Sequence, residues 1–248
     1  AASREAEQKR LYVLNALRCG ESPLTVATVS ALMQRTIPPQ TLIKAAFTVK
    51  DGEACPPEEL ERALVRCGYT RCEQVEGAGQ FSRRGGIVDF FSPSYPEPVR
   101  IEFWGDDIDS MGFFDVRTQR RTESVEACRI LPAAESLATL ATGGTEALTE
   151  ALTAAADKCS RHKSSQQLRE LEQTLCTDIE RLRQNVKLEY ADRYMPFMYE
   201  KASGADFIPE EAVVFIDQPP RCADRARGFI KQLGEDVGEL VKRGILAT

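Results

Sequence analysis

The sequence of 248 residues predicts a mixed α+β and α/β fold, with an antiparallel β-meander between two mainly helical regions. Two patterns indicate this fold. Between about residues 69 and 131, short β-type runs are separated by turns that contain glycine and proline, whereas apolar residues outside this region recur at helical spacing. Charged residues make up 28% of the chain and apolar residues 42%, values that are typical of a globular protein and argue against disorder.

The first helical region begins with a helix over residues 3–18, which ends at the stop signal Cys19-Gly20. A β-branched stretch at 24–29 then precedes a short helix. Ser30 is expected to cap that helix, and Pro38-Pro39 is expected to close this part of the chain.

The meander follows an apolar segment at 42–49 and a helix over 57–67 that Pro56-Pro57 is expected to open. Short turns join its strands, so neighbouring strands are expected to run antiparallel. Five strands are predicted, at residues 69–76, 80–91, 99–104, 108–114 and 124–131.

The second helical region contains a predicted amphipathic helix over 168–186, whose apolar stripe is expected to pack against a neighbouring domain. A coiled-coil partner for this stripe is the alternative. The run 212–217 is predicted to be a buried, parallel strand, followed by a helix that starts at Pro219-Pro220 and ends near residue 243.

Composition and motifs exclude several function classes. No apolar run approaches the roughly 18 residues of a membrane span, and the net charge of −6 argues against a general nucleic-acid coat. The sequence has neither a GxxxxGK[ST] phosphate loop nor a GxGxxG motif after a strand, so nucleotide hydrolysis by these residues alone is not expected. Eight scattered cysteines without a CxxC pair fit a reducing cytoplasm rather than a zinc site. The single histidine, His162, is expected to be solvated.

Four carboxylates gather near the end of the third predicted strand, at Glu102, Asp106, Asp107 and Asp109. They could suggest a magnesium or acid–base site. Three of them lie in or beside a turn, however, where aspartate is favoured because it hydrogen-bonds to nearby backbone. The turn is the preferred interpretation.

The predicted strand 99–104 suggests a binding surface. Because side chains alternate between faces, Arg100, Glu102 and Trp104 lie opposite the apolar face of this strand. The preceding strand, expected to pair with it, carries Arg83 and Arg84, and one of these must share the face of Arg100. Tryptophan and arginine dominate binding hot spots, and guanidinium groups pair with carboxylates of a partner. The alternative is that Trp104 caps the core at the end of the strand.

Three ordered motifs in this region resemble the UvrB interaction domain family. They lie at residues 79–91, 100–108 and 114–120, and the family's patterns are GxFSxRGGIxDxF, RIEFFGDxI and FDxxTQR. The resemblance covers about residues 47–135. Flanking segments at 26–34 and 214–219 are similar to the amino-terminal, UvrB-like module of the transcription-repair coupling factors, the Mfd family.

The resemblance implies that the domain docks UvrA, the damage-recognition ATPase of nucleotide excision repair. The family's contact residues fall on Arg84, Arg100 and Trp104, where Trp104 replaces the usual phenylalanine, and Arg83 and Glu102 are secondary candidates. No catalytic residue, cofactor site or metal site is expected.

The resemblance also implies the domain organisation. Residues 1–46 and 136–248 are expected to be two parts of a helicase-like α/β domain, and residues 47–135 the docking domain inserted between them. The opening strand and degenerate nucleotide loop of the α/β domain are expected upstream of Ala1. ATP, magnesium, RNA polymerase and double-stranded DNA are expected to be bound by other domains of the ATP-dependent DNA translocases that the chain resembles. Neither a membrane partner nor catalytic activity of this segment is expected.

Two alternatives remain at this stage. The chain could be the corresponding part of UvrB, an ATP-dependent damage-verification protein, or it could bind DNA directly through Arg83, Arg84 and Arg100. Direct DNA binding predicts an affinity that falls steeply with salt concentration.

Overall fold

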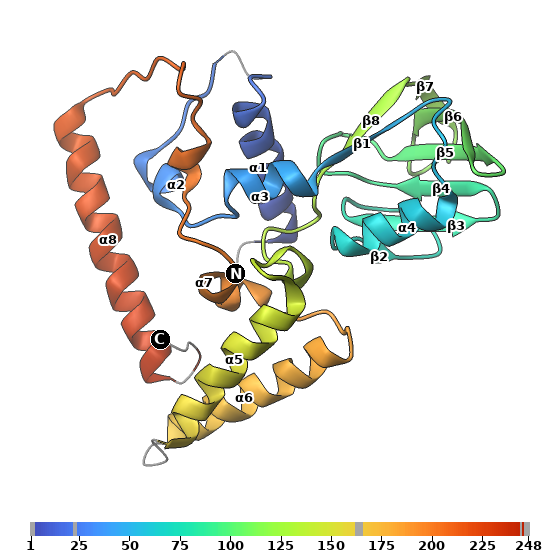
Figure 1. Cartoon of the computed structure of the whole chain (residues 1–248). Coiled ribbons are helices and arrows are strands. Elements are labelled where there is room, and N and C mark those ends of the chain that lie inside the picture. Colours follow the sequence, from blue (N-terminus) through green and yellow to red (C-terminus); the bar gives the residue numbers. More distant parts are fainter. Residues whose placement is uncertain (1–2, 22–23, 162–165, 244, 246–248) are drawn as a thin grey trace. The chain divides into compact units, whose positions relative to one another are not determined.

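The computed structural model describes residues 3–21, 24–161, 166–243 and 245 (Figure 1). His162 lies outside these residues. The chain forms two compact units, each built from two separate stretches. Unit 1 comprises Ala1–Ser22 and Pro39–Leu137, and unit 2 comprises Pro23–Pro38 and Ala138–Thr248. The domain boundaries at residues 46 and 135 stay a prediction.

Unit 1 contains a six-stranded sheet whose strands are neighbours in the order in which they follow along the chain. Its strands are β2 (Thr70–Arg71), β3 (Gln80–Arg84), β4 (Ile87–Phe90), β5 (Val99–Trp104), β6 (Asp107–Phe114) and β7 (Arg121–Ser124). The sheet is antiparallel from β3 to β7, and only the short β2 runs parallel to β3. The predicted meander and mixed fold class are therefore confirmed.

A second, two-stranded sheet in unit 1 pairs β1 (Phe47–Lys50) with β8 (Ala127–Ile130). The prediction of one strand over 124–131 was therefore wrong, because the chain leaves the meander after β7 and pairs with β1 instead. The predicted strand 69–76 shrinks to β2. After β2, the Gln80 side chain accepts hydrogen bonds from the backbone N–H groups of Glu76 and Gly77. These N–H groups therefore bond to a side chain and not to the backbone of a neighbouring strand.

The predicted single strand 80–91 is in fact a hairpin of β3 and β4, with its turn at Gly85-Gly86. Gly85 has φ +61°, a left-handed conformation that favours glycine. A glycine with positive φ at the first position of a two-residue turn gives a twist that matches that of an antiparallel hairpin. As a consequence, β5 pairs with β4 and not with the strand that carries Arg83 and Arg84.

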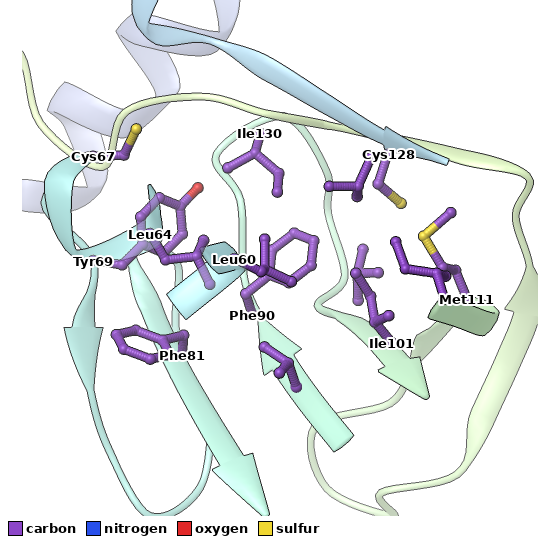
Figure 2. Close-up of a cluster of buried hydrophobic side chains, with 14 of the residues drawn as sticks. Leu60, Leu64, Cys67, Tyr69, Phe81, Phe90, Ile101, Met111, Cys128 and Ile130 are labelled. Carbon is purple, nitrogen blue, oxygen red and sulfur yellow. The ribbon is translucent and has the colours of Figure 1, made fainter. Parts of the chain in front are cut away.

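The core of unit 1 lies on one face of the six-stranded sheet (Figure 2). Leu60 and Leu64 of α4 (Pro57–Arg66) are buried in the same cluster as Phe90 of β4 and Ile101 of β5. The buried Tyr69 donates a hydrogen bond from its hydroxyl group to the backbone oxygen of Leu131 at 2.8 Å. The apolar face of strand 99–104 is thus the core face, as predicted.

Two further helices belong to unit 1. Ser3 caps α1 (Arg4–Arg18) by accepting a hydrogen bond from Ala6, and the Gln8 side chain donates to the backbone oxygen of Ala78 at 2.9 Å. Pro39 opens α3 (Pro39–Ala45) rather than closing the preceding part of the chain. Proline suits the first turn of a helix because its missing N–H group is not needed there.

Unit 2 is mainly helical. Its elements are α2 (Val29–Met33), η1 (Ala138–Leu140), α5 (Gly144–Arg161), α6 (Gln166–Arg183), η2 (Ala191–Tyr194), α7 (Met195–Met198), η3 (Gly204–Phe207) and α8 (Pro219–Lys242). Thr28, not Ser30, caps α2 by accepting a hydrogen bond from Ala31 at 3.2 Å. Buried residues on α6, among them Leu171 and Leu175, form the predicted stripe, but this stripe packs against α5 of the same unit.

The prediction of a buried strand at 212–217 was wrong. No strand is assigned there, and the Phe215 side chain is 91% exposed. A strand needs a neighbouring strand to satisfy its backbone groups, and the described residues offer none to this segment. The helix after Pro219-Pro220 is present as α8, although none of its residues is buried. None of the described helices has the length and apolar character needed to cross a membrane.

Candidate partner-binding surface

The face of the six-stranded sheet opposite the core cluster is called the outer face here. Strand β5 places Arg100 on it, and Asp89 of β4 stands directly opposite Arg100 in the register. The Arg100 Nε and Nη2 atoms donate to the two carboxylate oxygens of Asp89 at 2.7 and 2.8 Å. Arg84 of β3 donates from Nη2 to Asp89 Oδ2 at 2.9 Å. Two arginines therefore share one carboxylate, and that carboxylate is buried.

The loop after β6 covers the other side of the Arg100 side chain. Gln119 accepts from Arg100 Nη1 with its backbone oxygen and from Nη2 with its side-chain oxygen, both at 3.2 Å. The guanidinium carbon of Arg100 lies 4.5 Å from the ring centre of the buried Phe114, which is a cation–π distance. Asp89 is the main cause that raises the pKa of Arg100 above its ordinary value.

Most of the hydrogen-bonding capacity of Arg100 is therefore used within the protein. Its side chain is only 16% exposed, and four contacts use four of the five N–H groups that a guanidinium carries. One N–H of Nη1 is left without a partner among the described residues. Arg84 differs, because its side chain is 52% exposed and is anchored through one nitrogen.

Trp104 ends β5 on the outer face, and its side chain is 82% exposed. The interpretation of Trp104 as a cap of the core is therefore wrong. Between Arg100 and Trp104, Glu102 accepts a hydrogen bond from Ser110 at 3.2 Å and lies 3.8 Å from the guanidinium of Arg121. The outer face thus presents an exposed indole and two guanidinium groups whose positions are set by neighbouring side chains.

The sequence model of the UvrB interaction domain family matches residues 47–135. Residues 47–135 belong to that family. This range includes the whole six-stranded sheet and both strands of the small sheet, so the outer face is part of the UvrB interaction domain.

The chain is also similar to transcription-repair-coupling factors. It is 31% identical to that of Bacillus subtilis over 245 residues, which are 98% of this chain and 21% of the relative. It is 39% identical to that of Myxococcus xanthus over 117 residues (47% of this chain, 10% of the relative) and 36% identical to that of Escherichia coli over 126 residues (51% and 11%). The chain therefore spans about a fifth of the length of the relative from Bacillus subtilis. These findings confirm the predicted family resemblance and do not favour the UvrB alternative.

Within the UvrB interaction domain, Arg83 lies apart from the outer face. Its guanidinium pairs with Glu58 at 2.5 Å and with Glu61 at 3.3 Å, both on α4. The hydrogen bond to Glu58 is the largest cause that raises the pKa of Arg83. The prediction that one of the two adjacent arginines shares the face of Arg100 is confirmed, and that arginine is Arg84.

Of the four carboxylates near the end of β5, Asp106 lies in the turn between β5 and β6, whereas Glu102 lies in β5 and Asp107 and Asp109 lie in β6. Gly105, with φ +63°, and Asp106 are the two turn residues between β5 and β6, and the backbone oxygen of Asp106 accepts a hydrogen bond from Cys55 at 2.8 Å. Among the described residues, no three histidine, cysteine, aspartate or glutamate side chains are placed to hold a metal ion.

Asp89 and Gln119 are the site residues that the sequence prediction missed. The strand Ile87–Phe90 is apolar except for Asp89, and a carboxylate in an apolar strand requires a charged partner. That signal was present in the sequence, but the misplaced strand over 80–91 hid the pairing with Arg100. Gln119 had no such signal, because its role depends on the path of a loop.

Proposed function

We propose that the UvrB interaction domain of this chain binds UvrA through its outer face, with Arg84, Arg100 and Trp104 as contact residues. The observation that carries the proposal is the 82% exposure of the Trp104 side chain on the face that also holds both arginines. A large, exposed and rigid side chain beside guanidinium groups is the composition of a binding hot spot.

The contact residues have separate roles in this proposal. Trp104 is the apolar anchor. Arg84 is half exposed and free to turn its remaining N–H groups toward carboxylates of UvrA. Arg100 contributes the single N–H that its internal partners leave open, and Glu102 with Arg121 forms a polar border beside Trp104.

In a transcription-repair coupling factor, this docking would recruit UvrA to a stalled RNA polymerase in the cytoplasm. The segment itself needs no cofactor and performs no catalysis in this proposal. ATP hydrolysis and the binding of RNA polymerase and double-stranded DNA would belong to other parts of the longer protein. The support is the similarity to coupling factors, of whose length the chain spans about a fifth at most.

Direct DNA binding through the three arginines is not favoured. Each arginine is paired with a carboxylate, Arg83 with Glu58 and Glu61, and Arg84 and Arg100 with Asp89. Phosphate binding would have to compete with these ion pairs. A gel-shift assay at two salt concentrations tests this alternative, because phosphate contacts give affinities that fall steeply with salt.

Calorimetric titration of the chain with UvrA tests the docking proposal. We expect Trp104→Ala and Arg84→Ala each to weaken binding by about 1–4 kcal/mol, the range of hot-spot residues. Arg83→Ala is the matched control. Arg83 is adjacent to Arg84 in the sequence but points away from the outer face, so this substitution should leave the affinity within about twofold. Unchanged affinity in both outer-face variants would refute the proposal.

A further inference from the structure

We propose that Asp89 and Gln119 are positioning residues for the UvrA contact, which hold Arg100 and Arg84 in their binding orientation before UvrA arrives. This inference rests on the proposed function, because it takes the outer face as the surface that UvrA contacts. Neither residue is itself expected to touch UvrA through an exposed group.

The case for Asp89 starts from its burial. A buried carboxylate is stable only when it is paired and hydrogen-bonded. Asp89 meets this condition with both oxygens, since Arg100 binds Oδ1 and Oδ2 and Arg84 binds Oδ2. Two guanidinium groups of like charge can therefore stand close together on one face of the sheet. The bidentate geometry with Arg100 also fixes the plane of that guanidinium.

The case for Gln119 starts from its backbone. Gln119 has φ +60°, a left-handed conformation that residues other than glycine rarely adopt. In this conformation its backbone oxygen and its side-chain oxygen both accept from Arg100. Its side-chain nitrogen donates to the backbone oxygen of Val116 at 2.7 Å, which fixes the orientation of the amide.

The loop that carries Gln119 is closed by Asp115. The Asp115 carboxylate accepts from the backbone N–H groups of Arg117 and Thr118 at 3.0 and 2.7 Å, and the bond from Thr118 is the largest cause that lowers the pKa of Asp115. Backbone hydrogen bonds also join Gln119 to Asp115 and Asp115 to Arg120. The loop is therefore held in shape by its own contacts and presents Gln119 to Arg100.

Because Arg100 is held in place before binding, its side chain should lose little conformational freedom when UvrA binds. A mobile arginine is ordered when a partner binds, and this ordering weakens the complex. Arg100 is already held from two sides, by Asp89 of β4 and by Gln119 of the loop, so its open N–H points in one direction. The competing explanation is that Asp89 and Gln119 stabilise the fold of the domain without affecting how Arg100 meets UvrA.

The first test uses Gln119→Gly in the whole chain. Glycine accepts the left-handed backbone and keeps the backbone oxygen, so only the side-chain contacts are lost. We expect UvrA to bind about 2- to 12-fold more weakly, the range that follows from ordering one long side chain. Gln218→Gly is the matched control, because Gln218 is a glutamine with φ +50° in unit 2. It should leave UvrA affinity unchanged.

The second measurement reads the position of Arg100 directly. In nuclear magnetic resonance spectra of the free chain, the Nη2 amino group of Arg100, which donates to both Asp89 and the Gln119 side chain, should rotate slowly and be slow to exchange with water. Gln119→Gly should increase its mobility, whereas Gln218→Gly should not. An equally rigid Nη2 amino group in Gln119→Gly would overturn the inference.

A double-mutant cycle separates positioning from a structural role. In an Arg100→Ala background, Gln119→Gly should change UvrA affinity by less than about twofold, because no guanidinium remains to be held. An undiminished effect in that background would overturn the inference. Asp89→Asn should weaken UvrA binding, whereas Asp178→Asn, which removes a buried carboxylate in unit 2, should not.

The outcomes for the two proposals differ. Unchanged affinity in both Trp104→Ala and Arg84→Ala would refute docking through the outer face. Weakened affinity in those variants, together with additive effects of Gln119→Gly and Arg100→Ala, would refute only the positioning role.

Discussion

The Tyr194 hydroxyl donates a hydrogen bond to the buried Asp178 carboxylate at 2.7 Å. The guanidinium of Arg193 binds the same oxygen at 2.9 Å. Unit 2 therefore contains its own buried carboxylate with an arginine partner, comparable with Asp89 and Arg100 of unit 1 but distant in sequence from the outer face. Burial raises the pKa of Tyr194, so its hydroxyl stays protonated and remains a donor at neutral pH.

Asp178→Ala should destabilise the protein by about 3–5 kcal/mol, because Arg193 and Tyr194 would lose their buried partner. Urea denaturation monitored by circular dichroism measures the change. UvrA affinity should stay the same at temperatures where the variant is folded. A loss of stability below about 1 kcal/mol would show that Asp178 is not a critical contact of unit 2.

Trp104 should report UvrA binding by itself, because it is the only tryptophan of the chain and its side chain is 82% exposed. When 5-fluorotryptophan is incorporated, the fluorine resonance of the free chain should be accessible to a soluble paramagnetic agent. UvrA should shift this resonance and protect it. A resonance that stays unshifted and accessible at saturating UvrA would place Trp104 outside the contact.

Gly79→Ala should lower the free energy of unfolding by more than about 1 kcal/mol. Gly79 has φ +77°, and a Cβ atom there would lie 2.8 Å from the Gln8 side chain and 3.0 Å from the Cβ atom of Ala133. The added methyl group would disturb the contact of α1 with the loop before β3. Gly77→Ala is the control, since a Cβ atom at Gly77 meets nothing within 4 Å. Equal thermal denaturation midpoints for the two variants would contradict this reasoning.

The buried thiols should make the protein less stable at alkaline pH. Burial raises the pKa of Cys67 to about 11 and that of Cys128 to about 12, from an ordinary value of 9.0. Above pH 9 the unfolded chain gains stability by ionising these thiols, whereas the folded chain does not until its higher pKa values are reached. Each thiol should remove up to about 1.4 kcal/mol of unfolding free energy per pH unit in that interval.

Urea denaturation between pH 7 and pH 10.5 measures this loss. Cys128→Ala should be less stable at neutral pH but should lose less stability as the pH rises. In native protein the exposed Cys19 and Cys176 should react with a thiol reagent well before Cys128 does, since the thiolate is the reactive form. Equal labelling rates would contradict the burial of Cys128.

Phe215→Ser should change the free energy of unfolding by no more than about 0.5 kcal/mol, as is usual for surface substitutions. Phe207→Ala is the comparison in the same unit, because Phe207 is fully buried, and it should cost about 3–5 kcal/mol. Denaturant titration of both variants measures the difference. A loss of more than about 2 kcal/mol in Phe215→Ser would support the buried strand that the sequence predicted.

The helix and strand types could be predicted where the signal was local. Pro57 at the start of α4 and the alternation along β5 were sufficient to place both elements. The hairpin of β3 and β4 was missed, because strand-type residues lie on both sides of the Gly85-Gly86 turn and were taken as one continuous strand. The segment 212–217 was predicted wrongly for a different reason. Its composition is that of a buried strand, but the described residues provide no neighbouring strand with which it could pair.

The amino-acid sequence was enough to place Arg100 and Trp104 on the same face of β5, because side chains alternate along any strand. The partners of Arg100 could not be predicted in this way, because they depend on the fold. Strand pairing places Asp89 opposite Arg100, and the loop after β6 brings Gln119 into contact with it. The guanidinium of Arg100, which was expected to be available to a partner protein, therefore makes most of its hydrogen bonds within this chain. Alternation is a property of consecutive residues, whereas pairing and loop path depend on groups far apart in the chain.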